Sequence, residues 1–244
     1  MKKKVLLVNL SGIGDIVSSL TVANPLLEKY EVTFFIPKIF AGLFNNSFYN
    51  ETFDLSEVSN INYDLLIDLT SNQKSREVCA RIKSKQKIGR YRDILQVFRF
   101  RKIYSKMVPK FTKPVHIIKD YYPINKLLDL RILEEIYLKQ ESQKNEKNIM
   151  SIHVGGDKVI RRIPERLVIE TINYFQKKEI NIRIIGIEKE VITSILSQTN
   201  GVIYEEGSLG DVKSWIDESR LVIASDSGLF HLATALGTPA IGLS

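Results

Sequence analysis

The stretch "KVLLVNLSGIGDI", residues 4–16, sets the expected fold because it joins an apolar run to a helix start through a glycine turn. Its first seven residues include five leucines or valines, which is typical of a strand buried on both faces of a parallel sheet. Two glycines and Asp15 follow, where a nucleotide-binding protein would keep its phosphate loop. A carboxylate repels phosphate, so the role of Asp15 has to be explained.

Strand and helix patterns alternate along the rest of the chain. From His116 to Leu138 the apolar positions recur at helical spacing, which predicts one long helix. The polar segment 139–148 is the predicted linker. We therefore predict an α/β fold with two Rossmann-like parallel-sheet domains, residues 1–140 and 149–244, facing a cleft. The other predicted strands are 31–37, 63–70, 86–91, 149–154, 180–187, 201–204, 220–225 and 239–243, and the other predicted helices are 16–29, 164–178, 188–199, 208–219 and 227–236.

The composition is that of a soluble globular protein, with 44% apolar and 26% charged residues. Neither a signal peptide nor an apolar run of about 20 residues is present, so we expect a cytoplasmic protein. One cysteine, Cys79, rules out an internal disulfide framework. The cysteine and three histidines lack metal-ligand spacing, so no metal site and no cysteine nucleophile are predicted.

Positive charge is concentrated in residues 76–113, which we call the basic segment. It holds 13 Lys or Arg against two acids, a net +11, whereas the whole chain carries +7. The segment suits nucleic acid, an anionic membrane or a phosphorylated acceptor, or it is simply a solvated basic face. Aromatic residues interleaved with the cations favour a membrane surface. The segment contains no recognisable nucleic-acid-binding fold, so no nucleic acid is expected as a partner.

The first glycine turn does not match a dinucleotide-binding fingerprint. Val17 stands where the third glycine belongs, and Lys38 rather than an acid follows the second predicted strand. Walker A is also absent, because no Gly-Lys-Ser/Thr follows the turn. Two interpretations of Asp15 remain: a carboxylate that satisfies free amides at a helix start, or a functional group.

Two stretches of the second half suit anion binding. In "ASDSGLFHLATALG", residues 224–237, a helix begins after Asp226, Ser227 and Gly228 at the end of a strand, which directs free amides into a crevice. His231 lies on that helix and is either part of the site or a half-buried helix residue. "HVGGDKVIRRIPE", residues 153–165, is either a pyrophosphate clamp or a solvated loop. Its cations are Lys158, Arg161 and Arg162.

Five segments in order resemble glycosyltransferase family 9, the ADP-heptose:lipopolysaccharide heptosyltransferases. "SDSGLFHLATALGTPAIGL" is the most specific of them. The others are "VLLVNLSGIGDIVSSLTVANPL", "YDLLIDLTSNQKS", "KPVHIIKDYYPINKLLDL" and "SIHVGGDKVIRRIPERL". The resemblance runs from residue 4 to residue 244 and implies a GT-B architecture, with acceptor bound by the first domain and nucleotide-sugar by the second.

The resemblance also implies the chemistry and the site residues. Asp15 matches the family's general base, and its turn of Ser11, Gly12 and Gly14 would face the acceptor. The nucleotide-sugar residues would be Lys158, Arg161, Glu190, Asp226, Ser227, Gly228 and His231. Arg161 replaces a lysine that is usual in the family, and Ile163 replaces a tryptophan.

The implied reaction is an inverting, metal-independent transfer of heptose, or a related sugar, from an ADP-sugar to a lipopolysaccharide core or other anionic glycolipid. The ADP-sugar is a substrate, and no cofactor is expected. The basic segment would contact the inner face of the inner membrane. Family members usually extend beyond the final predicted strand, so the resemblance also implies a truncated second domain. A non-catalytic or truncated nucleotide-sugar-binding module of the same fold is the alternative.

Overall fold

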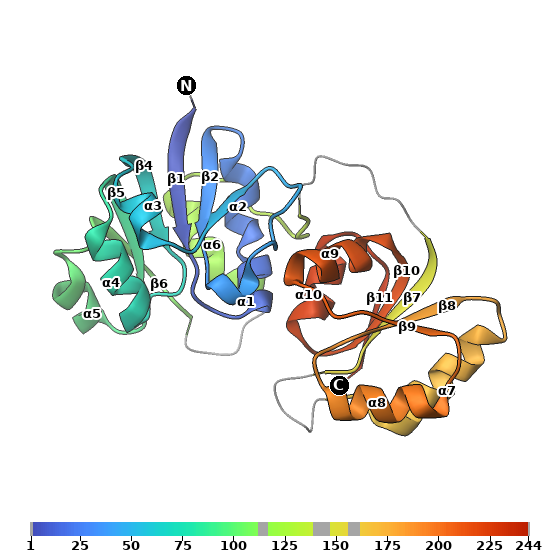
Figure 1. The fold of residues 1–244 in the computed structure, drawn as a ribbon. Helices are drawn as coiled ribbons and strands as arrows, with labels where there is room; N and C mark the ends of the chain where they lie inside the picture. The colour runs from blue at the N-terminus through green and yellow to red at the C-terminus, as the bar shows by residue number, and fades with distance from the viewer. Residues whose placement is uncertain (1, 112–116, 139–146, 156–161, 244) are drawn as a thin grey trace. The chain divides into compact units, whose positions relative to one another are not determined.

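A computed structural model describes residues 2–111, 117–138, 147–155 and 162–243, and it divides into two compact units, Met1–Glu141 and Ser142–Ser244. Each unit is an α/β body built around one parallel sheet (Figure 1). Most of the predicted linker, residues 139–146, lies outside the described residues. The two units are described separately below.

The first unit contains a six-stranded parallel sheet with the order β3-β2-β1-β4-β5-β6. The four strands predicted from the sequence are confirmed, and β1 is buried from Val5 onward. The two strands that the sequence did not reveal, β3 and β6, are short edge strands. The bounds are β1 Lys3–Val8, β2 Tyr30–Phe35, β3 Asn50–Thr52, β4 Tyr63–Asp68, β5 Ser84–Tyr91 and β6 Lys106–Pro109.

Short helices connect these strands, and the single helix predicted for residues 116–138 is wrong. Residues 112–116 lie outside the described residues. Beyond them the helical part ends near Leu128, because Asp129 adopts a positive φ of 51° and Leu130 N donates back to Asn125 O. The helices are α1 Ile13–Ser18, α2 Leu20–Leu26, η1 Lys38–Phe40, α3 Leu55–Ser59, α4 Gln73–Arg81, α5 Ile94–Phe100, η2 Ile117–Tyr121 and α6 Tyr122–Leu127.

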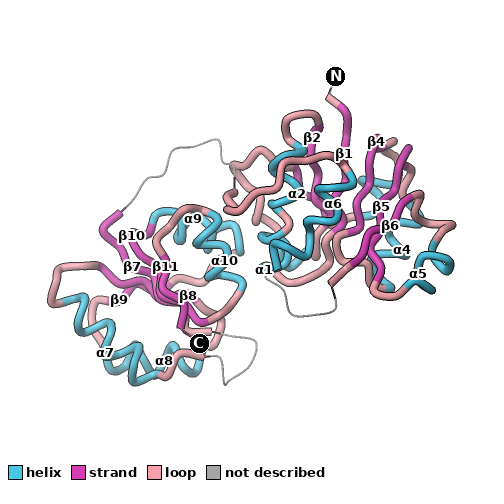
Figure 2. The backbone as a smooth tube through the Cα atoms, turned by 180° about the vertical axis from the view of Figure 1, so that it is seen from behind, coloured by secondary structure: helices cyan, strands magenta, loops and turns pink. Residues whose placement is uncertain are grey.

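The second unit contains a five-stranded parallel sheet with the order β11-β10-β7-β8-β9. Its core joins the buried strands to the apolar faces of α7 and α8, seen on one side of the sheet in Figure 2. Every strand and helix predicted within residues 149–243 is confirmed. The bounds are β7 Lys147–His153, α7 Glu165–Gln176, β8 Asn181–Ile185, α8 Lys189–Gln198, β9 Val202–Tyr204, α9 Leu209–Glu218, β10 Ser219–Ser225, α10 Gly228–Ala235 and β11 Ala240–Leu243.

Among the described helices, none is long and apolar enough to cross a membrane.

Candidate functional site

The carboxyl ends of the central strands place polar residues at one edge of each sheet. In the first unit β1 pairs with both β2 and β4, and Val8 lies beside Asp68 where the two strands end. In the second unit β7 pairs with β8 and β10, so His153 ends its strand beside Ala224 and Ile185. Ligands of open α/β sheets bind where the strand order reverses, beyond the carboxyl ends, so both edges are candidate sites.

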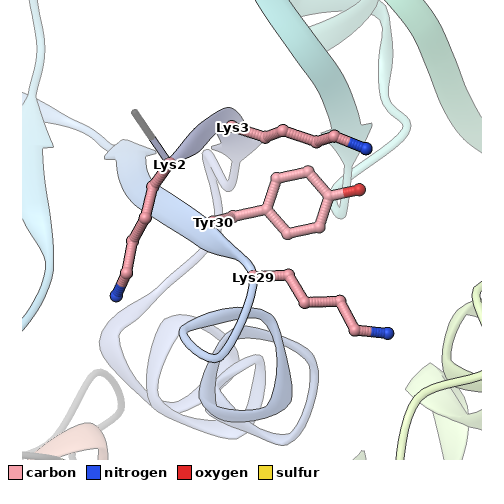
Figure 3. Close-up of a pocket in the computed structure, with 4 residues that line it drawn as sticks. All are labelled: Lys2, Lys3, Lys29 and Tyr30. Carbon is pink, nitrogen blue, oxygen red and sulfur yellow. The ribbon is translucent and has the colours of Figure 1, made fainter.

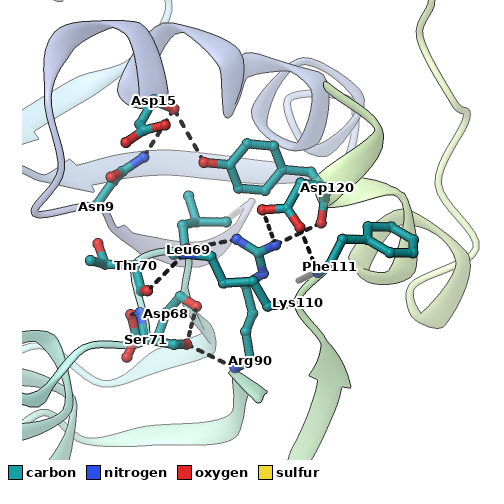
Figure 4. Close-up of polar contacts among 11 residues, drawn as sticks. Asn9, Asp15, Asp68, Leu69, Thr70, Ser71, Arg90, Lys110, Phe111 and Asp120 are labelled. Carbon is teal, nitrogen blue, oxygen red and sulfur yellow. Dashed lines mark hydrogen bonds and ion pairs between the residues drawn. The ribbon is translucent and has the colours of Figure 1, made fainter. Parts of the chain in front are cut away.

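Asp15 is held at the first edge through its backbone. Gly12 is the N-cap of α1, and Asp15 lies in the first helical turn. The backbone carbonyl of Asp15 accepts hydrogen bonds from Asn9 Nδ2 and Tyr121 Oη, each at 3.3 Å (Figure 4). Ser11 N donates to Asn9 Oδ1 at 3.2 Å. Among the described residues no hydrogen bond reaches the Asp15 carboxylate, so the structure fixes its backbone and leaves its oxygens available.

The buried cation Arg90 supports the Asp15 turn through Tyr121. Arg90 is 1% exposed, and its guanidinium lies 4.9 Å from the Tyr121 ring centroid. Its Nη2 lies 2.6 Å from Asp120 Oδ2 and donates to Asp120 O at 2.7 Å, while Nη1 donates to Leu69 O at 3.0 Å (Figure 4). A buried ion pair with several hydrogen bonds has a defined geometry. Arg90 therefore holds the ring that contacts Asp15.

Asp68 forms a second buried network at the same edge. It is fully buried and accepts from Ser71 N at 2.7 Å, from Ser75 Oγ at 2.9 Å and from Tyr104 Oη. Burial raises the pKa of Asp68, and these donors oppose the shift. Because the carboxylate is enclosed by protein donors, it closes the turn after β4 rather than facing a ligand.

The open side of the turn has room for a ligand. Nothing lies within 4 Å of the position that a Cβ on Gly12 would occupy, and its φ of −74° suits any residue. The free protein itself therefore does not require glycine there. Lys110 lies at the same edge, with Nζ 3.5 Å from Thr70 O. Burial and the nearby Arg90 charge lower the pKa of Lys110, while the charges of Asp120 and Asp15 oppose that shift.

Ser227 begins α10 at the second edge without capping it. It adopts extended φ and ψ of −141° and 169°, yet its side chain makes no cap hydrogen bond. Instead its Oγ lies 3.3 Å from His153 Nδ1. Burial lowers the pKa of His153, so the neutral imidazole is favoured, although the Glu188 charge opposes that shift. The first amides of α10, starting at Gly228, are therefore available to an anion.

Asp226 and His231 flank this helix start. The Asp226 side chain is 65% exposed, and the half-exposed His231 places Nε2 3.9 Å from Asp226 Oδ1. Ser225, at the end of β10, is fully buried and donates to Gly155 O at 2.9 Å. The structure thus brings Asp226, Ser227, Gly228 and His231 together with His153, which was not among the predicted site residues.

A second acid, Glu188, lies beside Gly155 at this edge. Glu190 is exposed in the first turn of α8, whereas Glu188 is the N-cap of that helix. A Cβ on Gly155 would lie 2.5 Å from the Glu188 carboxylate oxygens, and Ile187 N lies 3.0 Å from Glu188 Oε2. Gly155 therefore provides room for Glu188, and residues 156–161 of the predicted clamp lie outside the described residues. Sequence patterns could not tell which of two acids two residues apart faces the strand ends.

Two predicted phosphate-binding residues, Lys158 and Arg161, lie outside the described residues. Within the described part of the chain, no group of three His, Cys, Asp or Glu side chains is arranged to hold a metal. A surface depression lined by Lys2, Lys3, Lys29 and Tyr30 lies at the amino ends of β1 and β2 (Figure 3). This is the sheet edge opposite Asp15, where α/β proteins do not place their ligands.

Comparison with known proteins gives consistent results. A family model described as glycosyltransferase family 9 (heptosyltransferase) matches residues 56–243. Lipopolysaccharide heptosyltransferase 1 of Campylobacter coli is 26% identical over an alignment of 292 residues, covering 98% of this chain and 82% of that protein.

Solved structures agree with this match. The E. coli heptosyltransferase WaaC with ADP has a TM-score of 0.77 at 19% identity, covering 98% of this chain and 86% of that one. E. coli ADP-heptose LPS heptosyltransferase II has a TM-score of 0.75 at 16% identity, covering 99% and 84%. These likenesses confirm the predicted α/β fold of the GT-B class, with its two parallel sheets.

Proposed function

This chain belongs to glycosyltransferase family 9, and on that premise we propose the reaction that it catalyses. The enzyme transfers heptose, or a closely related sugar, from an ADP-sugar to a lipopolysaccharide core or another anionic glycolipid. Supporting this choice, the Campylobacter coli relative is a lipopolysaccharide heptosyltransferase, and similar folds were solved with ADP and with ADP-2-deoxy-2-fluoro heptose.

The helix start at Ser227 carries the donor side of the proposal. Because Ser227 bonds to His153 rather than to its own helix, the amides of α10 can receive the diphosphate. Charge grows on the diphosphate as it leaves, and helix amides together with Lys158 and Arg161 would stabilise it without a metal. Asp226 and His231, which flank this helix start, would contact the donor sugar, and Glu188 or Glu190 would accept hydrogen bonds from the ribose.

Asp15 carries the acceptor side. A hydroxyl of the acceptor attacks the anomeric carbon and passes its proton to the Asp15 carboxylate. The new carbon–oxygen bond forms as the bond from that carbon to the diphosphate oxygen breaks, and ADP leaves with the electron pair. One displacement inverts the anomeric centre. The open space over Gly12 admits the acceptor, and the basic segment contacts its anionic lipid part or the inner face of the inner membrane.

A turnover screen tests the proposed function. The purified chain is incubated with ADP-, UDP- and GDP-sugars, with a deacylated core acceptor, and with or without EDTA. We expect release of ADP from the ADP-sugar at a rate that EDTA does not change. Binding of an ADP-sugar without any transfer would contradict the proposal and support a non-catalytic binding module. Loss of turnover in EDTA would contradict the metal-independent mechanism.

A further inference from the structure

Helix α5 presents its apolar side to solvent. The exposed fractions are 61% for Ile94, 74% for Leu95 and 65% for Phe98, and no residue of the helix is buried. At 100° per residue, these three positions span an arc of about 100°. A surface helix ordinarily turns such an arc toward the core, so its outward direction here is unusual.

The opposite side of α5 is packed, so the helix has a fixed orientation. Arg76 of α4 stacks its guanidinium 3.9 Å from the Phe100 ring centroid and lies 3.5 Å from Gln96 Oε1. Phe100 also packs against the core of the first unit. Asp93 caps the helix by accepting from Gln96 N at 3.2 Å. The apolar side therefore faces outward while the rest of the helix is anchored.

Cations border the apolar side, although the basic segment as a whole is not a surface patch. Arg90 is buried in an ion pair, and Lys85 pairs with Asp64 at 2.6 Å. Around α5 the only acid between residues 92 and 102 is Asp93, the helix cap. The exposed cations there are Arg92, Arg99, Arg101 and Lys102. An apolar helical face bordered by cations matches the interface of an anionic bilayer in both polarity and charge.

We propose that α5 docks the enzyme on an anionic lipid bilayer. Ile94, Leu95 and Phe98 enter the boundary between headgroups and acyl chains, and the four bordering cations pair with lipid phosphates. Both views place α5 at the outer rim of the first unit, beside α4 (Figures 1 and 2). The purpose of this docking rests on the proposed function, because a lipid-linked acceptor lies in such a surface.

Vesicle flotation tests the apolar contact. The full chain is mixed with vesicles of phosphatidylcholine alone or with phosphatidylglycerol added. Changing Ile94, Leu95 and Phe98 to Gln should weaken binding to the anionic vesicles by about tenfold or more. The matched control changes three exposed apolar residues elsewhere, Ile39, Ile132 and Leu167, to Gln and should bind as the wild type does.

The cations are tested in the same assay. Changing Arg92, Arg99, Arg101 and Lys102 to Gln should weaken binding at low salt by about fivefold per cation. The control neutralises Lys2, Lys3 and Lys29 at the depression of Figure 3 and should have little effect. If the control variants lost as much vesicle binding as the α5 variants, the assignment to α5 would be overturned. Failure of the wild type to bind anionic vesicles would overturn it as well. A dimer in solution that the apolar variant abolishes would identify a second copy as the occupant and also overturn it.

Activity separates this proposal from the proposed function. With a deacylated, water-soluble acceptor, variants of the apolar side, at Ile94, Leu95 and Phe98, should turn over at the wild-type rate. With acceptor embedded in vesicles, their rate should fall in parallel with binding. An α5 variant that is as active as the wild type on vesicles contradicts the docking proposal. A wild type that is inactive on every acceptor contradicts the proposed function and leaves the flotation result to decide the docking.

Discussion

The two candidate sites differ in how their polar groups are satisfied. Below the Asp15 turn, the supporting side chains are buried and already bonded, with Arg90 1% and Tyr121 3% exposed. At the start of α10, Asp226 and His231 are partly exposed and Ser227 leaves the helix uncapped. A base must be positioned before its substrate arrives, whereas a site for a charged leaving group needs donors that are still free. The two units therefore suit different tasks.

The largest expected effect concerns the base. Asp15→Asn should lower turnover by roughly 10²–10⁴-fold, the usual contribution of a general base, and leave ADP affinity unchanged. Steady-state kinetics and calorimetric titration with ADP measure the two quantities. Asp54→Asn is the control, because it makes the same change at the N-cap of α3, which follows the edge strand β3, two strands away from β1. If the variant lost ADP affinity by the same factor as turnover, Asp15 would belong to the nucleotide site, and the two sites would not have separate roles.

The next effect concerns the rigid support of the first site. Arg90→Leu leaves Asp120 and two carbonyls without their donor, and should lower the free energy of unfolding by about 3–5 kcal/mol. Urea denaturation measures this loss. Lys85→Met breaks an exposed pair of equal length, with Asp64, and should cost less than about 1 kcal/mol. If the two variants lost similar stability, Arg90 would not be a support.

A smaller effect concerns the contact to Asp15 itself. Tyr121→Phe removes the donor to the Asp15 carbonyl and should slow turnover by about fivefold, the value of about one hydrogen bond. Tyr63→Phe is the control, because its buried hydroxyl has no hydrogen-bond partner among the described residues. Both variants should unfold at similar temperatures. A Tyr121 variant with unchanged kinetics would show that the function of Asp15 does not depend on this hydrogen bond.

The smallest effect is the pH dependence of the second unit. Burial lowers the pKa of His153 below its usual 6.5, so the unfolded chain takes up this proton first as pH falls. Stability is therefore fully present above about pH 6.5 and declines as pH drops from there toward the folded pKa. Thermal unfolding between pH 7.5 and 5 should show a decline that His153→Asn reduces. A decline of the same size in that variant would assign it to other groups.

Most of the fold followed from apolar periodicity, and the errors lie where periodicity is weak or where tertiary hydrogen bonds override it. β3, with the sequence Asn-Glu-Thr, is too short and polar to show alternation. Apolar spacing across residues 116–138 suggested one helix, yet Asn125 donates to the carbonyls of Thr21 and Arg131 and fixes a reversal of the chain. Such long-range hydrogen bonds leave no local pattern in a sequence.

Only some features of the candidate sites could be predicted from the sequence. A strand end, a small-residue turn and a helix are local features, so Asp15 and the 226–231 group could be chosen from the sequence. His153 is equally local, because it begins the motif "HVGGDKVIRRIPE" at the end of a predicted strand. The contact of Glu188 with Gly155, and the burial of Arg90 within the basic segment, depend on tertiary packing. Counting charges therefore overstated the exposed charge of that segment.

The division of tasks between the two units is tested most directly by hydrogen–deuterium exchange of the full chain with and without ADP. We expect ADP to slow exchange in residues 153–155 and in the first turn of α10, beginning at Gly228, while residues 9–16 exchange unchanged. Protection that falls on residues 9–16 and spares α10 would contradict the account, because it would place the nucleotide at Asp15.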